Sequence, residues 1–185
     1  MENLINFIRQ YTRLDKEAEE ALIEYIEPGS YSKNGYLLQE GQICSRVWFI
    51  QTGSVRKFYL HEGKEITVWI HFENEMFTSL SSYFQQQPSD EYLQACEDTA
   101  LLSISYTNSL KLNSYPQIGK FSRLHLEEQF SIIDKISKKF SQMSALEKYK
   151  ALAEMTPTLI KRAKLGHIAS IMGVSQETLS RIRAK

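Results

Sequence analysis

The sequence predicts an α+β fold in which a β-rich half is followed by a helical half. Between residues 30 and 105, short runs of β-branched and aromatic residues alternate with turn dipeptides such as Asn34-Gly35, a spacing typical of a small β-roll or sandwich. Residues 117–142 then carry an uninterrupted helical pattern, and residues 165–185 have the pattern of two short helices joined by a tight turn.

These features divide the chain into three parts. Residues 1–113 are predicted to form a double-stranded, jelly-roll-like β-roll flanked by helices, residues 114–143 one long helix, and residues 144–185 a helix-turn-helix. The first part opens with a helical region over residues 3–27, where apolar residues recur at helical spacing, and this region ends at a Pro-Gly pair.

Six strands are expected in the roll, each a short run rich in β-branched or aromatic residues. They cover residues 36–38, 47–50, 55–60, 66–72, 92–95 and 101–104. Between the fourth and fifth runs lies a segment of different composition, Glu73–Glu91, which is rich in Ser and Gln. We expect this segment to hold one helical turn and a loop.

Two apolar stripes run along the long helix. The first contains Phe121, Ile132, Ile136 and Phe140, and the second contains Leu126, Phe130 and Ile133. Two stripes indicate that one face packs on the roll and the other on a partner helix. We expect the first stripe to form the seam of a homodimer; the alternative is a single helix that packs only within its own chain.

The charges of the two halves are opposite, although the formal net charge is zero. Residues 1–110 contain 8 Lys and Arg against 16 Asp and Glu, whereas residues 111–185 contain 14 against 6. The basic surplus continues to the end of the chain, because residues 161–185 hold six basic side chains and one acid, Glu177. The basic half is therefore the part expected to meet phosphate groups.

Composition and spacing disfavour several functional classes. Two cysteines, Cys44 and Cys96, are too few for a disulfide framework or a four-thiolate cluster. No close His-x-His pair or nucleophile–base pair is visible, so we expect no enzyme, no metal site and no cofactor. No apolar run is long enough to span a bilayer and the N-terminus lacks signal-peptide features, which predicts a cytoplasmic protein without a membrane partner.

The C-terminal pattern has the chemistry of a helix-turn-helix. Gly173 falls where the first helix must stop, because glycine accepts the left-handed conformation of a sharp turn. Ser175 can cap the second helix, and Leu179 and Ile182 turn one of its faces to the core. The other face shows side chains able to read base edges in a major groove; the alternative is a surface helical hairpin without nucleic acid. These side chains are Gln176, Thr178, Ser180, Arg181 and Arg183.

Three sequence motifs occur in the same order as in a known family. They read GYLLxxG at residues 35–41, FIxxGxVR at 49–56 and GVSQETLSRI at 173–182. With a helix-flanked roll, one long helix and a C-terminal helix-turn-helix, the chain resembles the cyclic-AMP receptor protein and Fnr superfamily of bacterial transcription regulators. The resemblance covers nearly the whole chain. It implies a homodimer that binds an inverted repeat in double-stranded DNA, with RNA polymerase as a further partner.

The resemblance also implies roles for individual residues. Those expected at the DNA are Ser175, Gln176, Glu177, Thr178, Arg181, Lys164 and Arg183. The base-reading positions fall on Gln176, Glu177 and Arg181, since arginine can pair with guanine, glutamate can accept from cytosine and glutamine can pair with adenine. The hydroxyls and the remaining basic residues would contact phosphates.

The family's ligand cassette runs from a Gly-Glu pair to an Arg-Ser or Arg-Thr pair, and this sequence departs from it. Asn74-Glu75 stands at the first place and Ser89-Asp90 at the second, so the arginine that would meet a cyclic phosphate is missing. No Lys or Arg occurs anywhere in residues 65–110. Because a buried phosphate needs a positive or well-aimed donor partner, cyclic nucleotides are disfavoured as ligands.

We therefore expect an unknown small-molecule effector that is neutral or apolar, or no effector. Its pocket would be lined by Glu75, Met76, Phe77, Ser89 and Asp90. The alternative function is a small-ligand-binding β-roll protein whose helix-turn-helix is vestigial. Many family members continue past the recognition helix into a β-hairpin wing, and no wing is evident in the residues up to Lys185.

Overall fold

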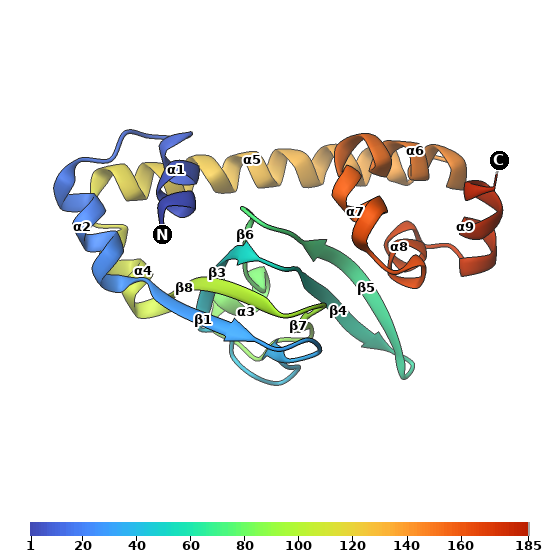
Figure 1. Cartoon of the computed structure of the whole chain (residues 1–185), viewed down its shortest axis with the longest axis horizontal. Helices are drawn as coiled ribbons and strands as arrows, with labels where there is room; N and C mark the ends of the chain where they lie inside the picture. The colour runs from blue at the N-terminus through green and yellow to red at the C-terminus, as the bar shows by residue number, and fades with distance from the viewer. Residues whose placement is uncertain (185) are drawn as a thin grey trace.

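Two antiparallel four-stranded sheets pack face to face to form the roll, with helices beside and above them (Figure 1). The computed structural model describes residues 1–184. One sheet has the strand order β1-β8-β3-β6 and the other β2-β7-β4-β5, which confirms the predicted α+β fold. The strands are β1 (Glu27–Tyr31), β2 (Tyr36–Leu38), β3 (Arg46–Thr52), β4 (Val55–His61), β5 (Lys64–His71), β6 (Met76–Phe77), β7 (Tyr92–Ala95) and β8 (Thr99–Ser105).

Nine helices accompany the strands within the described residues. They are α1 (Glu2–Arg9), α2 (Lys16–Tyr25), α3 (Leu80–Gln85), α4 (Tyr106–Leu112), α5 (Pro116–Phe140), α6 (Ala145–Met155), α7 (Pro157–Arg162), α8 (Leu165–Met172) and α9 (Gln176–Arg183). The N-terminal helical region is two helices, because Asp15 caps α2 by accepting the backbone N–H of Ala18 at 2.9 Å. The segment Glu73–Glu91 contains β6 as well as α3, and so has more regular structure than predicted.

The turns of the roll follow the glycine signals in the sequence. Gly53 between β3 and β4 has a φ of 95°, and a Cβ at this position would lie 2.8 Å from the backbone of Asp98 and Thr99. No other residue type fits without moving the facing loop. The β4–β5 hairpin turns at Glu62 and Gly63, whose φ angles are both positive, as two-residue hairpin loops require.

An apolar cluster fixes α1, α2 and the start of α5 to the first sheet. Leu4 and Ile8 of α1 pack with Phe49 of β3, and Ile118 and Phe121 of α5 complete the contact. All five side chains are almost fully buried. The N-terminal half of α5 is therefore anchored to the roll.

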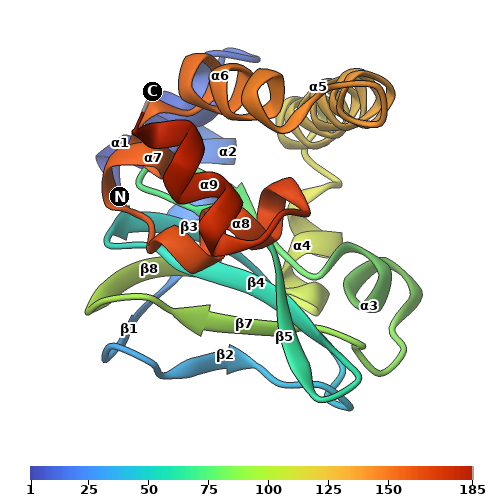
Figure 2. The same cartoon turned by 90° about the vertical axis from the view of Figure 1, so that its right-hand side faces the viewer.

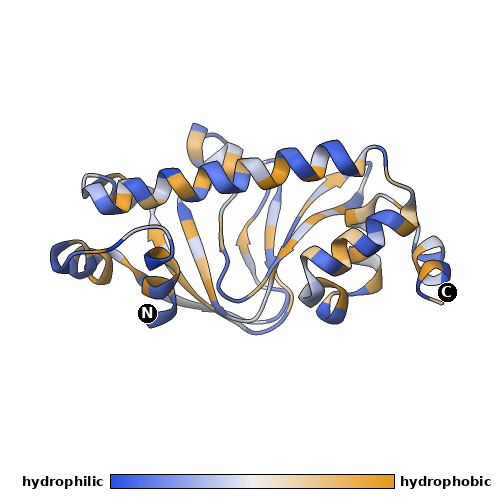
Figure 3. Cartoon of the chain, turned by 90° about the horizontal axis from the view of Figure 1, so that it is seen from above, coloured by the Kyte–Doolittle hydropathy of each residue, from blue (hydrophilic) through white to orange (hydrophobic). Residues whose placement is uncertain are grey.

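Helix α5 crosses the molecule from the N-terminal helices to the C-terminal ones (Figures 1 and 3). Its 25 residues span about 37 Å, and apolar and polar positions alternate along its length in Figure 3. It begins at Pro116, a residue well suited to the first position of a helix. The next helix opens with a capping box of Ser144 and Glu147, so a new helix starts after α5 ends.

The C-terminal helices pack directly on the roll at strand β5 (Figure 2). Ile70 of β5 and Phe72 just after it share one apolar cluster with Leu159 of α7 and with Ile168 and Met172 of α8. Each of these five side chains is no more than 4% exposed. The helices of residues 145–183 therefore share a core with the roll as well as a covalent connection to α5.

Candidate nucleic-acid interface and ligand cassette

The turn between α8 and α9 has the geometry expected from its sequence. Gly173 adopts φ 67° and ψ 36°, and the N–H of Val174 donates to the carbonyl of Ala169 at 3.0 Å, which closes the end of α8. The side-chain oxygen of Ser175 accepts the N–H of Thr178 at 3.2 Å and caps α9. Leu179 is fully buried and holds α9 against α8.

The outer face of α9 is open to solvent at one end of the molecule (Figure 2). Gln176, Glu177 and Arg181, the predicted base-reading residues, are all exposed, and so is Arg183. The pKa of the Glu177 carboxyl is lowered by hydrogen bonds from the Glu177 backbone N–H and from the Ser175 hydroxyl. This face therefore combines an anionic acceptor, an amide and two guanidinium groups on one short helix.

The side chain of Gln176 leans back onto α8. An added Cβ at Gly166 would lie 2.2 Å from the amide nitrogen of Gln176, so the amide occupies the space that the glycine leaves. The sequence contains no local signal for this contact, because it depends on how the two helices cross.

Arg162 does not belong to the exposed basic face. Its guanidinium bonds Glu73 and Glu97 on the roll, at 2.5 to 3.0 Å, so it is already paired in the absence of any partner. Lys164, at the start of α8, is exposed. Some basic residues near the C-terminus therefore hold the helices on the roll. Fewer of them can contact phosphate groups than their number in the sequence indicates.

The first half of the predicted effector pocket is filled by the protein's own side chains. Phe77 of β6 stacks on Trp48, with 5.8 Å between ring centroids, and on His71, with 4.8 Å. Only 5% of Phe77 is exposed. The Glu75 carboxylate lies 3.0 Å from Nδ1 of His71, so it is engaged within the chain. Met76 packs against the N-terminal cluster.

The second half of the pocket is also closed by internal hydrogen bonds. The Ser89 hydroxyl is buried, lies 3.3 Å from the Ser79 hydroxyl and donates to the carbonyl of Glu91 at 3.0 Å. Asp90, which follows Ser89, is exposed. Ser89 is therefore buried and Asp90 exposed, although the sequence prediction placed both residues in one pocket.

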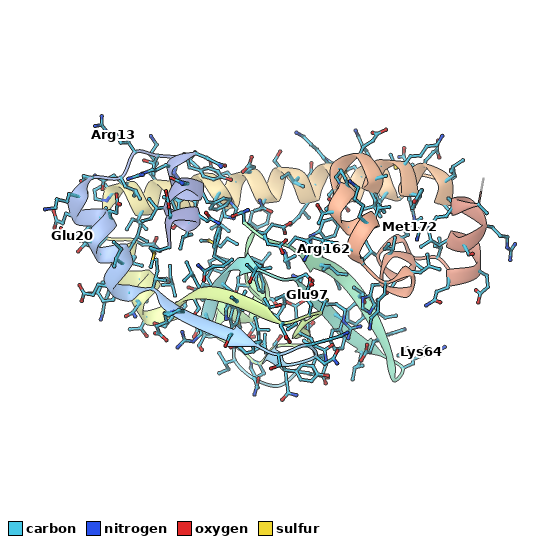
Figure 4. The ribbon with its side chains drawn as sticks, viewed as in Figure 1. Arg13, Glu20, Lys64, Glu97, Arg162 and Met172 are labelled. Carbon is cyan, nitrogen blue, oxygen red and sulfur yellow. The ribbon has the colours of Figure 1, made fainter. Side chains whose placement is uncertain are left out.

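The basic residues on neighbouring strands do not supply a free cation to the cassette. Lys57 of β4 comes near it, but its Nζ lies 3.7 Å from the Glu91 carboxylate and both side chains are about 15% exposed. Arg56 turns the other way, toward α8, and Lys64 lies at the tip of the β4–β5 hairpin (Figure 4). Among residues 1–184, no group of three or more His, Cys, Asp or Glu side chains is placed to hold a metal ion.

Two of the four residues predicted at the dimer seam pack within the chain. Phe121, predicted at the dimer seam, is 4% exposed in the core with α1, and Phe140 packs against the C-terminal cluster. Ile132 and Ile136 continue the row of Phe121 along the helix; Ile132 is 39% exposed and Ile136 is half-buried. This row faces its own chain at both ends, because the N-terminal and C-terminal helices pack there.

The second stripe is the more exposed one. Phe130 is 66% exposed and Ile133 is 50% exposed, the largest values among the apolar residues of α5. Leu126 and Phe130 line a groove that runs toward Asn113 at the end of α4. An unpartnered apolar row therefore lies on the side of α5 that the sequence prediction assigned to the roll.

A match with a known family supports the reading of the roll. Residues 28–112 match the sequence profile of the cyclic nucleotide-binding domain. The roll is therefore similar to a cyclic nucleotide-binding domain. No curated protein matches the chain in sequence. None of the helices in the part of the chain that the structure describes is long and apolar enough to cross a membrane.

Solved structures of regulators are similar to nearly the whole chain. FixK2 from Bradyrhizobium japonicum has a TM-score of 0.70 at 17% identity, covering 86% of this chain and 83% of that one. The c-di-GMP responsive global regulator CLP from Xanthomonas campestris has 0.69 at 13%, covering 92% and 90%. The catabolite activator protein from Thermus thermophilus has 0.58 at 21%, covering 92% and 83%. The chain has the fold of the Crp/Fnr transcription regulators.

One histidine at the contact between α8 and the roll gives the fold a dependence on pH. His167 lies against the buried Arg56, with 3.3 Å between Nε2 and Nη1. Burial, followed by the charges of Arg56 and Lys164, lowers the pKa of His167 from 6.5 to about 4, and Glu65 acts in the opposite direction. Between these two pH values the unfolded chain binds more protons than the folded one. The folded protein therefore becomes less stable as the pH falls.

We therefore expect the free energy of unfolding to fall as the pH drops from about 6.5 to about 4. Urea denaturation followed by circular dichroism at several pH values measures this loss. His167→Gln should reduce it, and His61→Gln, at an exposed position, is the matched control. Equal pH slopes for the His167→Gln and wild-type proteins would contradict the assignment.

Proposed function

We propose that the protein is a homodimeric transcription regulator of the cytoplasm that binds an inverted repeat in DNA through α9. The observation that carries the proposal is the exposed face of α9, where Gln176, Glu177 and Arg181 are all exposed on a helix held by buried Leu179. The fold shared with regulators such as FixK2 supports it. Contact with RNA polymerase, implied by the sequence resemblance, stays a prediction.

The chemistry of α9 suits the major groove. A helix of this size enters the groove, and Arg181 in its last turn can donate two parallel hydrogen bonds to one guanine. Glu177, an anion in its first turn, can accept from a cytosine amino group. Lys164 at the start of α8 and Arg183 at the end of α9 are exposed and can neutralise phosphates.

The dimer seam is proposed along Leu126, Phe130 and Ile133 of α5. These residues recur at spacings of four and three, which gives one straight row on a helix. A second copy of the same row is self-complementary across a two-fold axis. Large apolar side chains that are half or more exposed, as Phe130 and Ile133 are, lose their contact with water when such a partner covers them.

The cassette is proposed not to bind cyclic nucleotides. A cyclic phosphate carries a full negative charge, and burying it is costly unless a cation pairs with it. Lys57 is held by Glu91, and Phe77 fills the space between Trp48 and His71. The alternative function, a ligand-binding roll with a vestigial helix-turn-helix, is supported less well, because side chains fill the cassette while α9 is exposed.

A DNA-binding experiment tests the function itself. The dimer should bind an inverted repeat whose half-sites lie about 34–36 Å apart, one helical turn. Arg181→Ala should relax the preference at one base pair and cost about 1–3 kcal/mol, because it removes a bidentate contact. Lys164→Ala, the comparison variant, should weaken binding to all DNA sequences alike and reduce the salt dependence of binding. Selection of DNA sites from a random library measures both; an unchanged preference for Arg181→Ala would show that α9 does not read bases.

A sedimentation experiment tests the seam. Phe130→Asp should dissociate the dimer, because it would bury an unpaired charge at the two-fold axis. Ile132→Asp, on the row whose two ends pack within the chain, is the matched control and should remain dimeric. Dissociation of the Ile132→Asp protein together with an intact Phe130→Asp dimer would return the seam to the first stripe.

A calorimetric titration with cyclic AMP and cyclic GMP tests the cassette. We expect no heat of binding at ligand concentrations up to about 1 mM, which corresponds to a binding free energy weaker than about −4 kcal/mol. Micromolar binding of either nucleotide would show that the side chains that fill the cassette move aside.

A further inference from the structure

The C-terminal helices are fastened to the roll by a charged clamp as well as by apolar packing. Arg162, the last residue of α7, donates through Nη1 to one oxygen of Glu73 at 2.5 Å and through Nη2 to the other at 3.0 Å. The same Nη2 donates to Glu97 at 2.7 Å. Figure 4 shows Arg162 pointing from α7 toward Glu97 on the roll. One guanidinium therefore joins α7 to two separate loops.

The roll holds both carboxylates in place independently of Arg162. Glu73 also accepts the backbone N–H of Gly53 at 2.9 Å, and Glu97 accepts the hydroxyl of Ser54 at 2.6 Å. The hydrogen bonds from Arg162 lower the pKa of Glu73, so the carboxylate stays ionised. Because the acceptors are fixed by tight turns, a bidentate pair sets the direction of α7 as well as its distance.

A second polar contact fixes α8 to the hairpin of β4 and β5. The buried Arg56 bonds Glu65 at 2.7 Å and lies 3.3 Å from His167 of α8. The N–H of Thr67 donates to the Ser170 hydroxyl at 2.8 Å, and this hydroxyl lies 3.3 Å from the Thr67 carbonyl. With the apolar cluster between them, α8 has little freedom to rotate on β5.

We infer that Arg162, Glu73 and Glu97 are positioning residues for DNA reading, an inference that rests on the proposed function. The proposed seam is on α5, which the N-terminal cluster fixes to the roll. The clamp fixes α7 and α8 to the same roll, and Leu179 fixes α9 to α8. The orientation of each α9 relative to the two-fold axis is thus set through the roll, in addition to the short connection between α5 and α6.

The consequence concerns the spacing between half-sites. Two α9 helices held at a fixed separation accept only DNA whose half-sites match that separation. Loosening the clamp leaves the base contacts of each α9 unchanged but lets the separation vary. Selectivity for spacing should then fall while the preference for bases within a half-site remains, which a purely structural role of the clamp would not produce.

The test uses the full-length dimer with Glu73→Gln and Glu97→Gln together. Glutamine keeps an acceptor oxygen for Gly53 and Ser54, and the substitution leaves every basic residue that could touch DNA in place. Glu19→Gln, which removes an ion pair with Arg9 between α1 and α2, is the matched control. Affinities are measured for inverted repeats with spacers of increasing length and for a single half-site.

We expect the double variant to lose discrimination between the best and neighbouring spacings by at least about fivefold, a factor typical of coupling between sites. Its affinity for the single half-site and the behaviour of the Glu19→Gln control should match the wild type. An unchanged spacing preference in the double variant would overturn the inference. If the double variant does not fold, Glu97→Gln alone, which leaves the Glu73 pair, replaces it with the same expected direction.

Hydrogen exchange of the DNA-free protein separates this inference from the proposed function. Amides of α7 and α8 should exchange faster in the double variant, and amides of α1 and α2 should not. If the wild type binds no DNA, the proposed function fails, whereas the exchange rates still report whether the clamp holds α7. Equal exchange in the variant and the wild type would show that apolar packing alone positions these helices.

Discussion

The burial of strand β5 under α7 and α8 is the contact on which the arrangement of the chain depends. Ile70 and Phe72 are 2% and 4% exposed, and burying an apolar side chain of this size contributes about 1.5–3 kcal/mol. Strand β5 pairs with β4 along seven residue pairs, so the helices that cover it are tied to the whole second sheet. Without this contact, α8 and α9 would be a hairpin too small to keep a fixed orientation.

The opposite charges of the two halves meet at the same contact. Glu73 and Glu97 of the acidic half bind Arg162 of the basic half, and Arg56 with Glu65 lies beside His167. Some of the basic side chains are therefore paired with carboxylates that hold the helices on the roll. Lys164 at the start of α8 and Arg181 and Arg183 on α9 are exposed and can meet a polyanion. A single count of charges cannot separate these two uses.

Local chemistry explains what the sequence predicts well. Gly173 and Ser175 act within a few residues of themselves, so the turn and the cap follow from residue type, as do the strands between turn dipeptides. The two stripes of α5 have the same period, so only the docking of α1 decides that Phe121 faces the core. The pairing of Arg162 with Glu73 joins residues that are 89 positions apart, and no periodicity reports it. Long-range packing, which sequence patterns do not contain, therefore determines the part of the site that the predictions miss.

The shared core also bears on how the chain folds as it is synthesised. The strands of the roll leave the ribosome before α7 and α8, since every strand precedes residue 106. During that interval the face of β5 with Ile70 and Phe72 has no cover, and an uncovered apolar strand surface invites association with other nascent chains. The C-terminal helices that cover this face are thus synthesised after all the strands. A fragment consisting of the roll alone would keep this apolar face of β5 exposed to solvent.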